Sequence, residues 1–315
     1  MIAVVIPCYR VKEHILRVVK GIGQEVEKIY VVDDACPEGS GKYVKENVSD
    51  PRVEVITHPK NLGVGGALKT GYRKALEDHA GIIVKLDGDG QMNPLLIPKL
   101  VEQIQNKQAD YVKGNRFHDL GSLRKMPGIR RFGNAILSFI NKMVSGYWNI
   151  MDPTNGFTAI SAVALKHLPL DKIDNRFFFE QDMLFRLNTI RAVVMDYPMK
   201  AEYDQENSNL KIRKVLFTFP FKYINRLSKR IFYSYFLRDF NVGSLELVLA
   251  FLFMGFGIIF GSIKWAHSIV SSQPATAGTV ILAGLPVILG FQSFLSFLHF
   301  DLTNIPQKPI SGFED

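Results

Sequence analysis

The sequence predicts an α/β fold, a mostly parallel sheet with helices on both faces, followed by a hydrophobic helical segment. Three observations lead to this prediction. Short apolar runs alternate with amphipathic segments up to about residue 205, which is typical of a parallel sheet. Basic and aromatic residues are then dense over residues 211–241. Two long, almost uncharged runs follow within residues 242–301, and each is long enough to cross a membrane.

The predicted strands are short apolar runs, and an amphipathic segment follows most of them. Strands are expected at residues 3–6, 28–33, 53–57, 82–87, 111–114 and 192–198. Helices are expected at residues 11–21, 41–47, 65–79 and 93–107. Ligands of such sheets bind beyond the carboxyl ends of the strands, so the residues just after each strand are the first candidates for a functional site.

The C-terminal third has a different chemistry from the predicted domain at residues 1–210. Residues 211–241 suit amphipathic helices at a membrane surface, although an ordinary pair of surface helices is the alternative. Spans are expected at about residues 244–263 and 275–300, with a tail at 302–315. Lys and Arg crowd before the first span and Lys308 follows the second, so the positive-inside rule places both ends in the cytoplasm.

Glycines recur in both predicted spans. They are Gly255, Gly257, Gly261, Gly284 and Gly290. Small residues let helices approach closely, so these positions predict tight packing within the helical hairpin or a homo-oligomer formed through it.

Composition excludes several classes of protein. The 315 residues carry a net charge of +8, which suits a nucleic acid, a membrane surface or an anionic substrate. No zinc-finger spacing and no RNA-recognition motif is present, so a nucleic-acid partner is not expected. Two cysteines give no disulfide framework.

The most informative stretch is Asp87-Gly88-Asp89-Gly90-Gln91, directly after a predicted buried strand. Two carboxylates and an amide on a glycine-containing turn are hard oxygen ligands that suit Mg²⁺ or Mn²⁺ and leave room for phosphate oxygens. An ordinary surface turn is the alternative. An EF-hand is excluded because Met92 and Pro98 stand where that loop needs Gly and Glu.

Other polar residues follow the remaining predicted strands. Asp33 and Asp34 end the second strand, where an acidic side chain can accept hydrogen bonds from a base or ribose, or cap a helix. Asn61 opens a glycine-rich entry to a helix that contains Lys69. Lys69 is expected to reach a phosphate or to be an ordinary solvated lysine. The loop is not a Walker A motif, because Leu68 replaces the required glycine.

Arginines and further acidic turns lie later in the same region. Arg116 follows a predicted strand, and Arg130 and Arg131 come further on; together they suggest binding of an anionic acceptor. Asp152 lies in an acidic turn, and Glu180 and Asp182 form another that also fits charges at a helix N-terminus.

Read together, these segments resemble family 2 of the inverting glycosyltransferases, and more closely the polyprenyl-phosphate glycosyltransferases related to dolichol-phosphate mannose synthase. The matching segments are Val5-Ile6-Pro7-Cys8-Tyr9, Val31-Val32-Asp33-Asp34, Asn61-Leu62-Gly63, Asp87-Gly88-Asp89-Gly90-Gln91, Gly114-Asn115-Arg116-Phe117, Asp152 with Asn155-Gly156-Phe157, and Glu180-Gln181-Asp182. Their order and spacing match over about the first 200 residues.

The resemblance implies a nucleotide-sugar-binding (GT-A-like) domain and roles for particular residues. Pro7, Tyr9, Asp33 and Asp34 would line the nucleotide, with Asn61, Lys69 and Gly88 beside the donor. A further set would act on the diphosphate, the acceptor and the reacting sugar: Asp87, Asp89 and Gln91 as metal ligands, Arg116, Arg130 and Arg131 on phosphates, and Asp152 beside the sugar.

Three departures from the family pattern are visible. Arg10-Val11 stands where the family usually has Asn-Glu, and Asn155 stands where relatives often carry Ser. The Q-x-x-R-W motif of processive polysaccharide synthases is absent, which argues against polymer synthesis.

The resemblance implies a membrane enzyme that moves one hexose-type sugar, with inversion, from a nucleotide diphosphate sugar to undecaprenyl or dolichyl phosphate. UDP is preferred over GDP, and Mg²⁺ or Mn²⁺ is the expected cofactor. The chain would be a multi-pass protein of the inner (cytoplasmic) membrane with its catalytic domain in the cytoplasm. The alternatives are another envelope glycan or lipid acceptor, a sugar-nucleotide-forming nucleotidyltransferase, and a non-catalytic membrane accessory protein.

Overall fold

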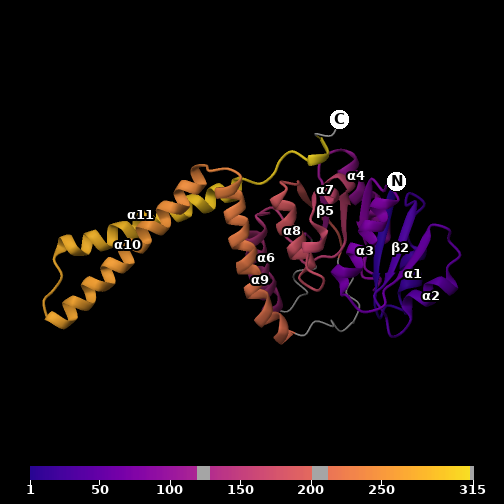
Figure 1. The fold of residues 1–315 in the computed structure, drawn as a ribbon, viewed down its shortest axis with the longest axis horizontal. Coiled ribbons are helices and arrows are strands. Elements are labelled where there is room, and N and C mark those ends of the chain that lie inside the picture. The colour runs from indigo at the N-terminus through magenta and orange to yellow at the C-terminus, as the bar shows by residue number, and fades with distance from the viewer. Residues whose placement is uncertain (119–127, 201–211, 313–315) are drawn as a thin grey trace. The chain divides into compact units, whose positions relative to one another are not determined.

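The computed structural model describes residues 1–118, 128–200 and 212–312 (Figure 1). Within those ranges, the side chains of residues 129, 130 and 212–217 are not described. The chain divides into two compact units. The first comprises Met1–Arg230 with Pro306–Asp315, and the second is Ile231–Ile305.

A seven-stranded sheet forms the centre of the first unit, with the strand order β3-β2-β1-β4-β6-β5-β7. Its strands are β1 (Ile2–Cys8), β2 (Lys28–Asp33), β3 (Val53–Thr57), β4 (Ile82–Lys85), β5 (Tyr111–Asn115), β6 (Thr158–Ser161) and β7 (Val194–Pro198). β6 runs antiparallel to both of its neighbours, and the other pairs are parallel. The α/β class and the mostly parallel sheet expected from the sequence are therefore confirmed.

Helices cover both faces of this sheet. In the first unit they are α1 (Ile15–Lys20), α2 (Ser40–Asn47), α3 (Val64–Glu77), α4 (Ile97–Gln105), α6 (Gly128–Ser145), α7 (Ala162–His167), α8 (Phe179–Thr189) and most of α9 (Ile212–Phe232). Short 3₁₀ turns η1 (Pro94–Leu96), η2 (Leu170–Lys172) and η4 (Ile310–Gly312) complete the unit.

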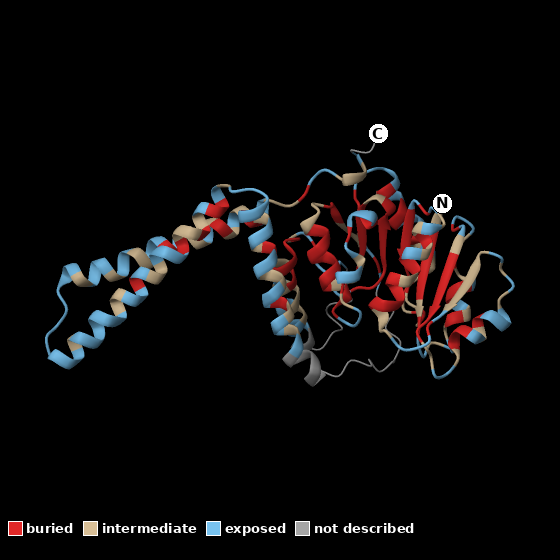
Figure 2. Cartoon of the chain, in the orientation of Figure 1, coloured by how far each residue is buried: buried red, intermediate tan, exposed pale blue. Residues whose placement is uncertain are grey.

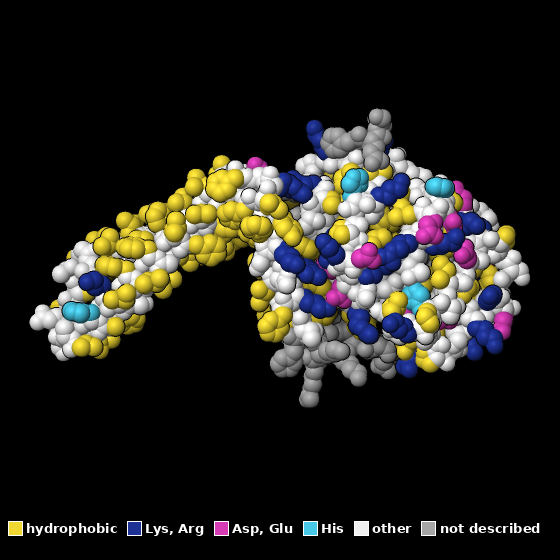
Figure 3. All heavy atoms as spheres, in the orientation of Figure 1, with side chains coloured by type: hydrophobic (Ala, Val, Ile, Leu, Met, Phe, Trp, Pro, Cys, Tyr) yellow, Lys and Arg dark blue, Asp and Glu magenta, His cyan; other side chains and the backbone are white. Residues whose placement is uncertain are grey.

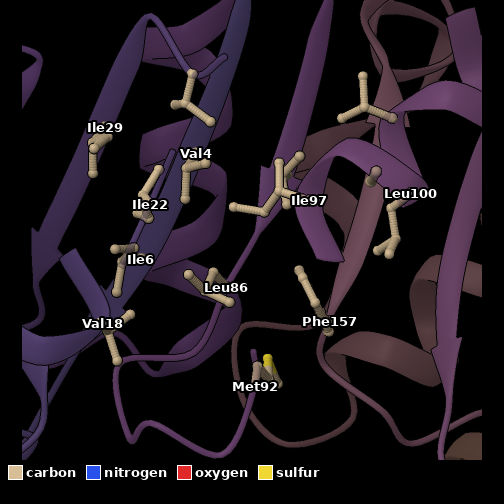
Figure 4. Close-up of a cluster of buried hydrophobic side chains, with 14 of the residues drawn as sticks. Val4, Ile6, Val18, Ile22, Ile29, Leu86, Met92, Ile97, Leu100 and Phe157 are labelled. Carbon is tan, nitrogen blue, oxygen red and sulfur yellow. The ribbon is translucent and has the colours of Figure 1, made fainter. Parts of the chain in front are cut away.

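The core lies on the two sides of the central strands (Figure 2). On one side, the cluster in Figure 4 joins strand residues such as Val4 and Ile6 to Val18 of α1 and Leu100 of α4. On the other side, α3 packs closely on β1, because a Cβ at Gly71 would collide with Val5. Strands buried on both sides read as continuous apolar runs, which is why the sequence pattern located β1, β2 and β4.

Several elements were not anticipated. β6 is only four residues long and pairs with both β4 and β5, and α6 and α7 were not predicted. The start of α8 was expected only as one reading of Glu180 and Asp182, and both residues do lie in its first turn. A run as short as Thr158–Ser161 is too brief for its periodicity to indicate a strand. Its pairing partners, distant in sequence, determine it.

The second unit is a helical hairpin. α10 (Val242–Ser271) and α11 (Ala277–Thr303) are both long and apolar enough to cross a membrane, and the hairpin surface in Figure 3 is mostly hydrophobic. α10 continues past residue 263, the end expected from the sequence, to Ser271. A Cβ at Gly257 would meet the backbone of Ala283, and one at Gly290 would meet Met254, so these glycines permit the close packing. At Gly255 and Gly284 a Cβ would meet no described residue beyond its chain neighbours and the nearby backbone of its own helix.

Polar contacts close the base of the hairpin. A π-helical turn, η3 (Tyr233–Leu237), precedes α10, and the Tyr235 hydroxyl donates to Asp301 of α11 at 2.6 Å. Ser296 of α11 likewise donates to Glu246 of α10 at 2.5 Å. Asn241 and Ser244 form a capping box at the start of α10.

After α11 the chain returns to the first unit. The backbone N–H groups of Ile310 and Ser311 donate to the buried carboxylate of Asp110, at 2.9 and 3.1 Å. The same carboxylate accepts from Val193 N–H at 2.8 Å. The chain thus leaves the first unit before α10 and rejoins it after α11.

Candidate functional site

Several of the candidate residues lie at one edge of the sheet. β1 has β2 on one side and β4 on the other, so the strand order reverses between β1 and β4, where open α/β sheets bind ligands. The Asp87–Gln91 turn follows β4, and Arg116 follows β5. Because β6 is antiparallel, the residues that precede it, including Asp152, lie at the same edge as the carboxyl ends of β4 and β5.

Lys85, at the end of β4, lies at the centre of this edge. Its ammonium nitrogen is 2.7 Å from Oε1 of Glu180 and 3.3 Å from Oδ1 of Asp87. Lys85 is 2% exposed. Burial alone would lower the pKa of this ammonium group, but the two carboxylates outweigh burial and hold its pKa above the usual value. Lys85 is therefore a charged group that joins the Asp87 turn to the N-terminus of α8.

The Asp87–Gln91 turn has the ligands that a hard divalent cation needs. The backbone N–H of Gln91 donates to Oδ1 of Asp89 at 3.0 Å, and Gly90 has a φ of +79° that favours glycine. Among the described residues, no group of three or more His, Cys, Asp or Glu side chains is placed to hold a metal ion. Magnesium sites that also use substrate phosphates need only one or two carboxylates, so the oxygens of Asp87, Asp89 and Gln91 fit such a cation.

Asp152 and Arg116 form a bidentate ion pair between a buried carboxylate and a partly exposed guanidinium. Arg116 Nε donates to Oδ2 of Asp152 at 2.7 Å and Nη2 donates to Oδ1 at 3.1 Å, and Thr154 Oγ1 also donates to Oδ1. Asp152 is fully buried. Burial alone would raise the pKa of Asp152, but Arg116 overrides it and holds that pKa below the usual value. Asp152 is thus an ionised group whose oxygens orient Arg116.

A second buried lysine lies two strands from Lys85. Lys85 and Lys113 are both paired in register with Thr158, and Lys113 is paired with Asp196 of β7. The Lys113 ammonium donates to the carbonyl of Asn155, and burial lowers the pKa of Lys113 to about 8. Burial also raises the pKa of Asp196 to about 6. Oδ2 of Asp196 accepts from Met151 N–H at 2.7 Å.

The acidic pair after β2 is held by backbone groups. Asp33 accepts from the N–H groups of Cys36 and Gly41, and Asp34 accepts from those of Leu62 and Gly63. Oδ1 of Asp34 is also 2.9 Å from the His58 ring. Both carboxylates are buried. In this structure they order the loops that the resemblance assigns to the nucleotide, and direct contact with the nucleotide stays a prediction.

The other residues predicted to contact the donor have mixed placements. Pro7 is partly buried, Tyr9 and Asn61 are exposed, and Gly88 is buried against Ile15. Lys69 is not the solvated lysine that was one of its two expected roles, because it is buried and its ammonium donates to the carbonyl of Ile173 at 3.0 Å. Lys69 therefore connects α3 to the segment before α8, and its contact with a phosphate stays a prediction.

The predicted arginine cluster is only partly described. Arg116 is directed to Asp152, and Arg131 is exposed in the first turn of α6. The side chain of Arg130 lies outside the described residues. A joint phosphate-binding role for the three arginines stays a prediction.

Basic residues of α9 contact other elements of the first unit. Arg226 Nε donates to Oδ1 of the buried Asp182 at 2.6 Å, and Lys222 pairs with Asp174. Arg230 donates to the carbonyl of Met143 at 2.7 Å. Asp182 of α8 also accepts from Asp174 N–H, so this carboxylate connects α9 to α8 and to the loop before it.

Sequence reasoning missed Lys85, Lys113 and the connection that Glu180 makes. A usable signal was present, because each lysine directly follows the apolar residues of a buried strand, in Ile82–Lys85 and in Tyr111–Asn115. Lysine is almost never fully buried unless it is paired, so a lysine inside a buried strand indicates nearby carboxylates.

Comparisons with known proteins identify the family. The model for "Glycosyl transferase family 2" matches residues 3–168. A UDP-N-acetylglucosamine–dolichyl-phosphate N-acetylglucosaminyltransferase of Methanococcus voltae is 31% identical over 65% of this chain and 87% of its own length. An undecaprenyl-phosphate mannosyltransferase of Micrococcus luteus is 31% identical over 54% of this chain and 70% of its own.

The fold has relatives among solved structures. Glucosyl-3-phosphoglycerate synthase of Mycobacterium tuberculosis, solved with Mn²⁺, UDP-glucose and phosphoglyceric acid, superimposes with a TM-score of 0.54. It is 17% identical and covers 73% of this chain and 79% of its own, which shows a shared GT-A-like fold. With the family model and the similarity to polyprenyl-phosphate sugar transferases, the conclusion is that this chain belongs to glycosyl transferase family 2.

Proposed function

We propose that this chain transfers a single hexose-type sugar, with inversion, from a UDP-linked donor to a polyprenyl phosphate. The observation that carries the proposal is the placement of the Asp87–Gln91 turn and the Arg116–Asp152 pair at one sheet edge, beside the reversal of strand order. The similarity to a dolichyl-phosphate and an undecaprenyl-phosphate sugar transferase supports the acceptor class.

The proposed reaction is one displacement. An oxygen of the acceptor phosphate attacks the anomeric carbon, the bond from that carbon to the diphosphate breaks, and the nucleoside diphosphate leaves with the bonding electrons. A phosphate monoester has a second pKa near 6, so the acceptor is mostly ionised at neutral pH and needs no strong base. Asp152 fits this scheme, because its oxygens already accept from Arg116 and would hold that guanidinium in place for a phosphate.

Asp87, Asp89 and Gln91 would hold Mg²⁺ or Mn²⁺, which would supply positive charge to the leaving diphosphate. Contacts within the protein orient two of these ligands: Lys85 pairs with Asp87, and the Gln91 N–H donates to Asp89.

We further propose that α10 and α11 cross the cytoplasmic membrane. The first unit, which holds the candidate site and is called the catalytic unit below, would lie on the cytoplasmic face. The chain rejoins the catalytic unit at Asp110 after α11, which fits a hairpin with both ends on one side. Within the catalytic unit, α6 exposes Phe132, Ile136 and Phe139 along one side of the helix, a pattern that suits a bilayer surface. Such an arrangement would keep the site near its lipid acceptor.

A transfer assay tests the proposal. The full chain, purified in detergent, would be given undecaprenyl phosphate, Mn²⁺ or Mg²⁺, and a panel of labelled UDP- and GDP-sugars. Label from one UDP-sugar is expected in the organic phase. Label from a GDP-sugar would correct the donor, and nucleoside diphosphate released without lipid label would indicate another acceptor. Donor binding without any turnover would favour a non-catalytic membrane accessory protein and overturn the proposal.

A further inference from the structure

The side chain of Lys85 lies between segments of three different sequence motifs. Its ammonium contacts Asp87 of the Asp87–Gln91 turn and Glu180 at the start of α8. A Cβ at Gly156, in the loop after Asp152, would collide with both the Asp87 carboxylate and this ammonium. The three segments are far apart in the sequence, and Lys85 connects them by charge and by close backbone approach.

The two carboxylates around Lys85 would otherwise repel each other. Both lie within 3.3 Å of the same nitrogen, so they face one small space. Side-chain exposure is 27% for Asp87 and 13% for Glu180, against 2% for Lys85, so the lysine is the innermost of the three. Two carboxylates facing one space are a good site for a divalent cation when no side-chain cation fills it.

We propose that Lys85 is a positioning residue of the donor site: its ammonium fills the space between Asp87 and Glu180, so that a divalent cation bound by Asp87 cannot also be bound by Glu180. The cation is thereby reserved for the outer side of Asp87, where a diphosphate can approach. This inference rests on the proposed function only in taking Asp87 as a metal ligand.

The first test measures Mn²⁺ binding to the detergent-purified full chain without nucleotide. Electron paramagnetic resonance quantifies the Mn²⁺ that stays free. Lys85→Met removes the charge and keeps an unbranched side chain. We expect Lys85→Met to bind Mn²⁺ at least about tenfold more tightly than the original chain, because one unit of positive charge beside the carboxylates is lost. The assay contains no sugar and no lipid, so it is independent of the donor and acceptor assignments.

Two further variants separate positioning from simple support of the fold. Lys85→Met/Glu180→Gln removes the second carboxylate and should abolish the gain in Mn²⁺ affinity. Lys85→Arg keeps the charge and should stay within about threefold of the original Mn²⁺ affinity. In the transfer assay, Lys85→Met should lower kcat while the Mn²⁺ concentration for half-maximal rate also falls, and a purely structural lysine would not produce that combination.

The outcomes that overturn the proposal are specific. The proposal is overturned if Lys85→Met folds but binds Mn²⁺ no more tightly than the original chain. It is also overturned if the gain in Mn²⁺ affinity persists in Lys85→Met/Glu180→Gln. Should Lys85→Met fold poorly without metal, the proposal requires Mn²⁺ to raise its melting temperature, because a cation would then replace the lysine. A melting temperature that does not respond to Mn²⁺ would also refute the proposal.

Discussion

The charged side chains after β2 bond mainly to backbone groups, whereas four charged side chains near the ends of β4 and β5 form ion pairs. Asp33 and Asp34 accept from N–H groups of the loops beside them. Lys85 and Asp87, like Arg116 and Asp152, pair with one another. Backbone partners cannot leave without unfolding a loop, while a charged side chain can exchange its partner for a charged ligand. The first group is therefore expected to govern loop structure, and the second to govern ligand chemistry.

The largest expected effect is at Asp89. Asp89→Asn keeps the shape of the turn but removes a negative charge where a divalent cation is proposed to bind. We expect turnover to fall by at least about 10³-fold, because a Lewis-acid contribution amounts to several kcal/mol. The transfer assay measures it, with the exposed Asp171→Asn as control. Turnover of Asp89→Asn at the original rate would remove the metal assignment.

The next largest effect is expected at the Arg116–Asp152 pair. Asp152→Asn places an amide where two guanidinium N–H groups now donate, and we expect kcat to fall about 100-fold with little change in the KM for the donor. Because the two residues act as a unit, Arg116→Gln should cost a similar factor and the double variant little more. Fully additive losses would show that Asp152 acts independently of Arg116, for example as a base.

Asp34 tests the other half of the comparison. In Asp34→Asn a buried carboxylate that accepts from Leu62 N–H, Gly63 N–H and the His58 ring is replaced by an amide. We expect the free energy of unfolding to fall by about 2 kcal/mol while the KM for the donor changes little. Asp171→Asn, at an exposed ion pair, should change stability by less than about 0.5 kcal/mol. Unchanged stability with much weaker nucleotide binding would instead make Asp34 a direct ligand.

The sequence predicted the sheet better than it predicted the site. Continuous apolar runs revealed β1, β2 and β4, because strands buried on both sides need no alternation. β6 escaped notice because its four residues are defined by pairing with β4 and β5. The Asp87–Gln91 turn was recognisable from composition and position. The partners of buried charges were not, since Lys85–Glu180 and Arg226–Asp182 join residues far apart in the chain.

The smallest expected effect is a pH dependence of stability caused by Asp196. Asp196 lies in β7, in register with Lys113 of β5. Burial raises the pKa of Asp196 to about 6, above its value in the unfolded chain near 4. Between these values the folded state binds more protons than the unfolded state, so stability decreases as the pH rises through this window. Above pH 6 the cost is fully present.

Asp196→Asn removes this titration, and its amide oxygen can still accept from Met151 N–H. We expect the variant to be more stable than the original chain by about 1–2 kcal/mol at pH 7.5, with the difference disappearing near pH 4. Melting curves of both proteins between pH 4 and 8 measure it. A stability difference between the two proteins that does not change with pH would show that Asp196 stays ionised in the fold and pairs with Lys113. Asp196 would then resemble the paired charges Lys85–Asp87 and Arg116–Asp152.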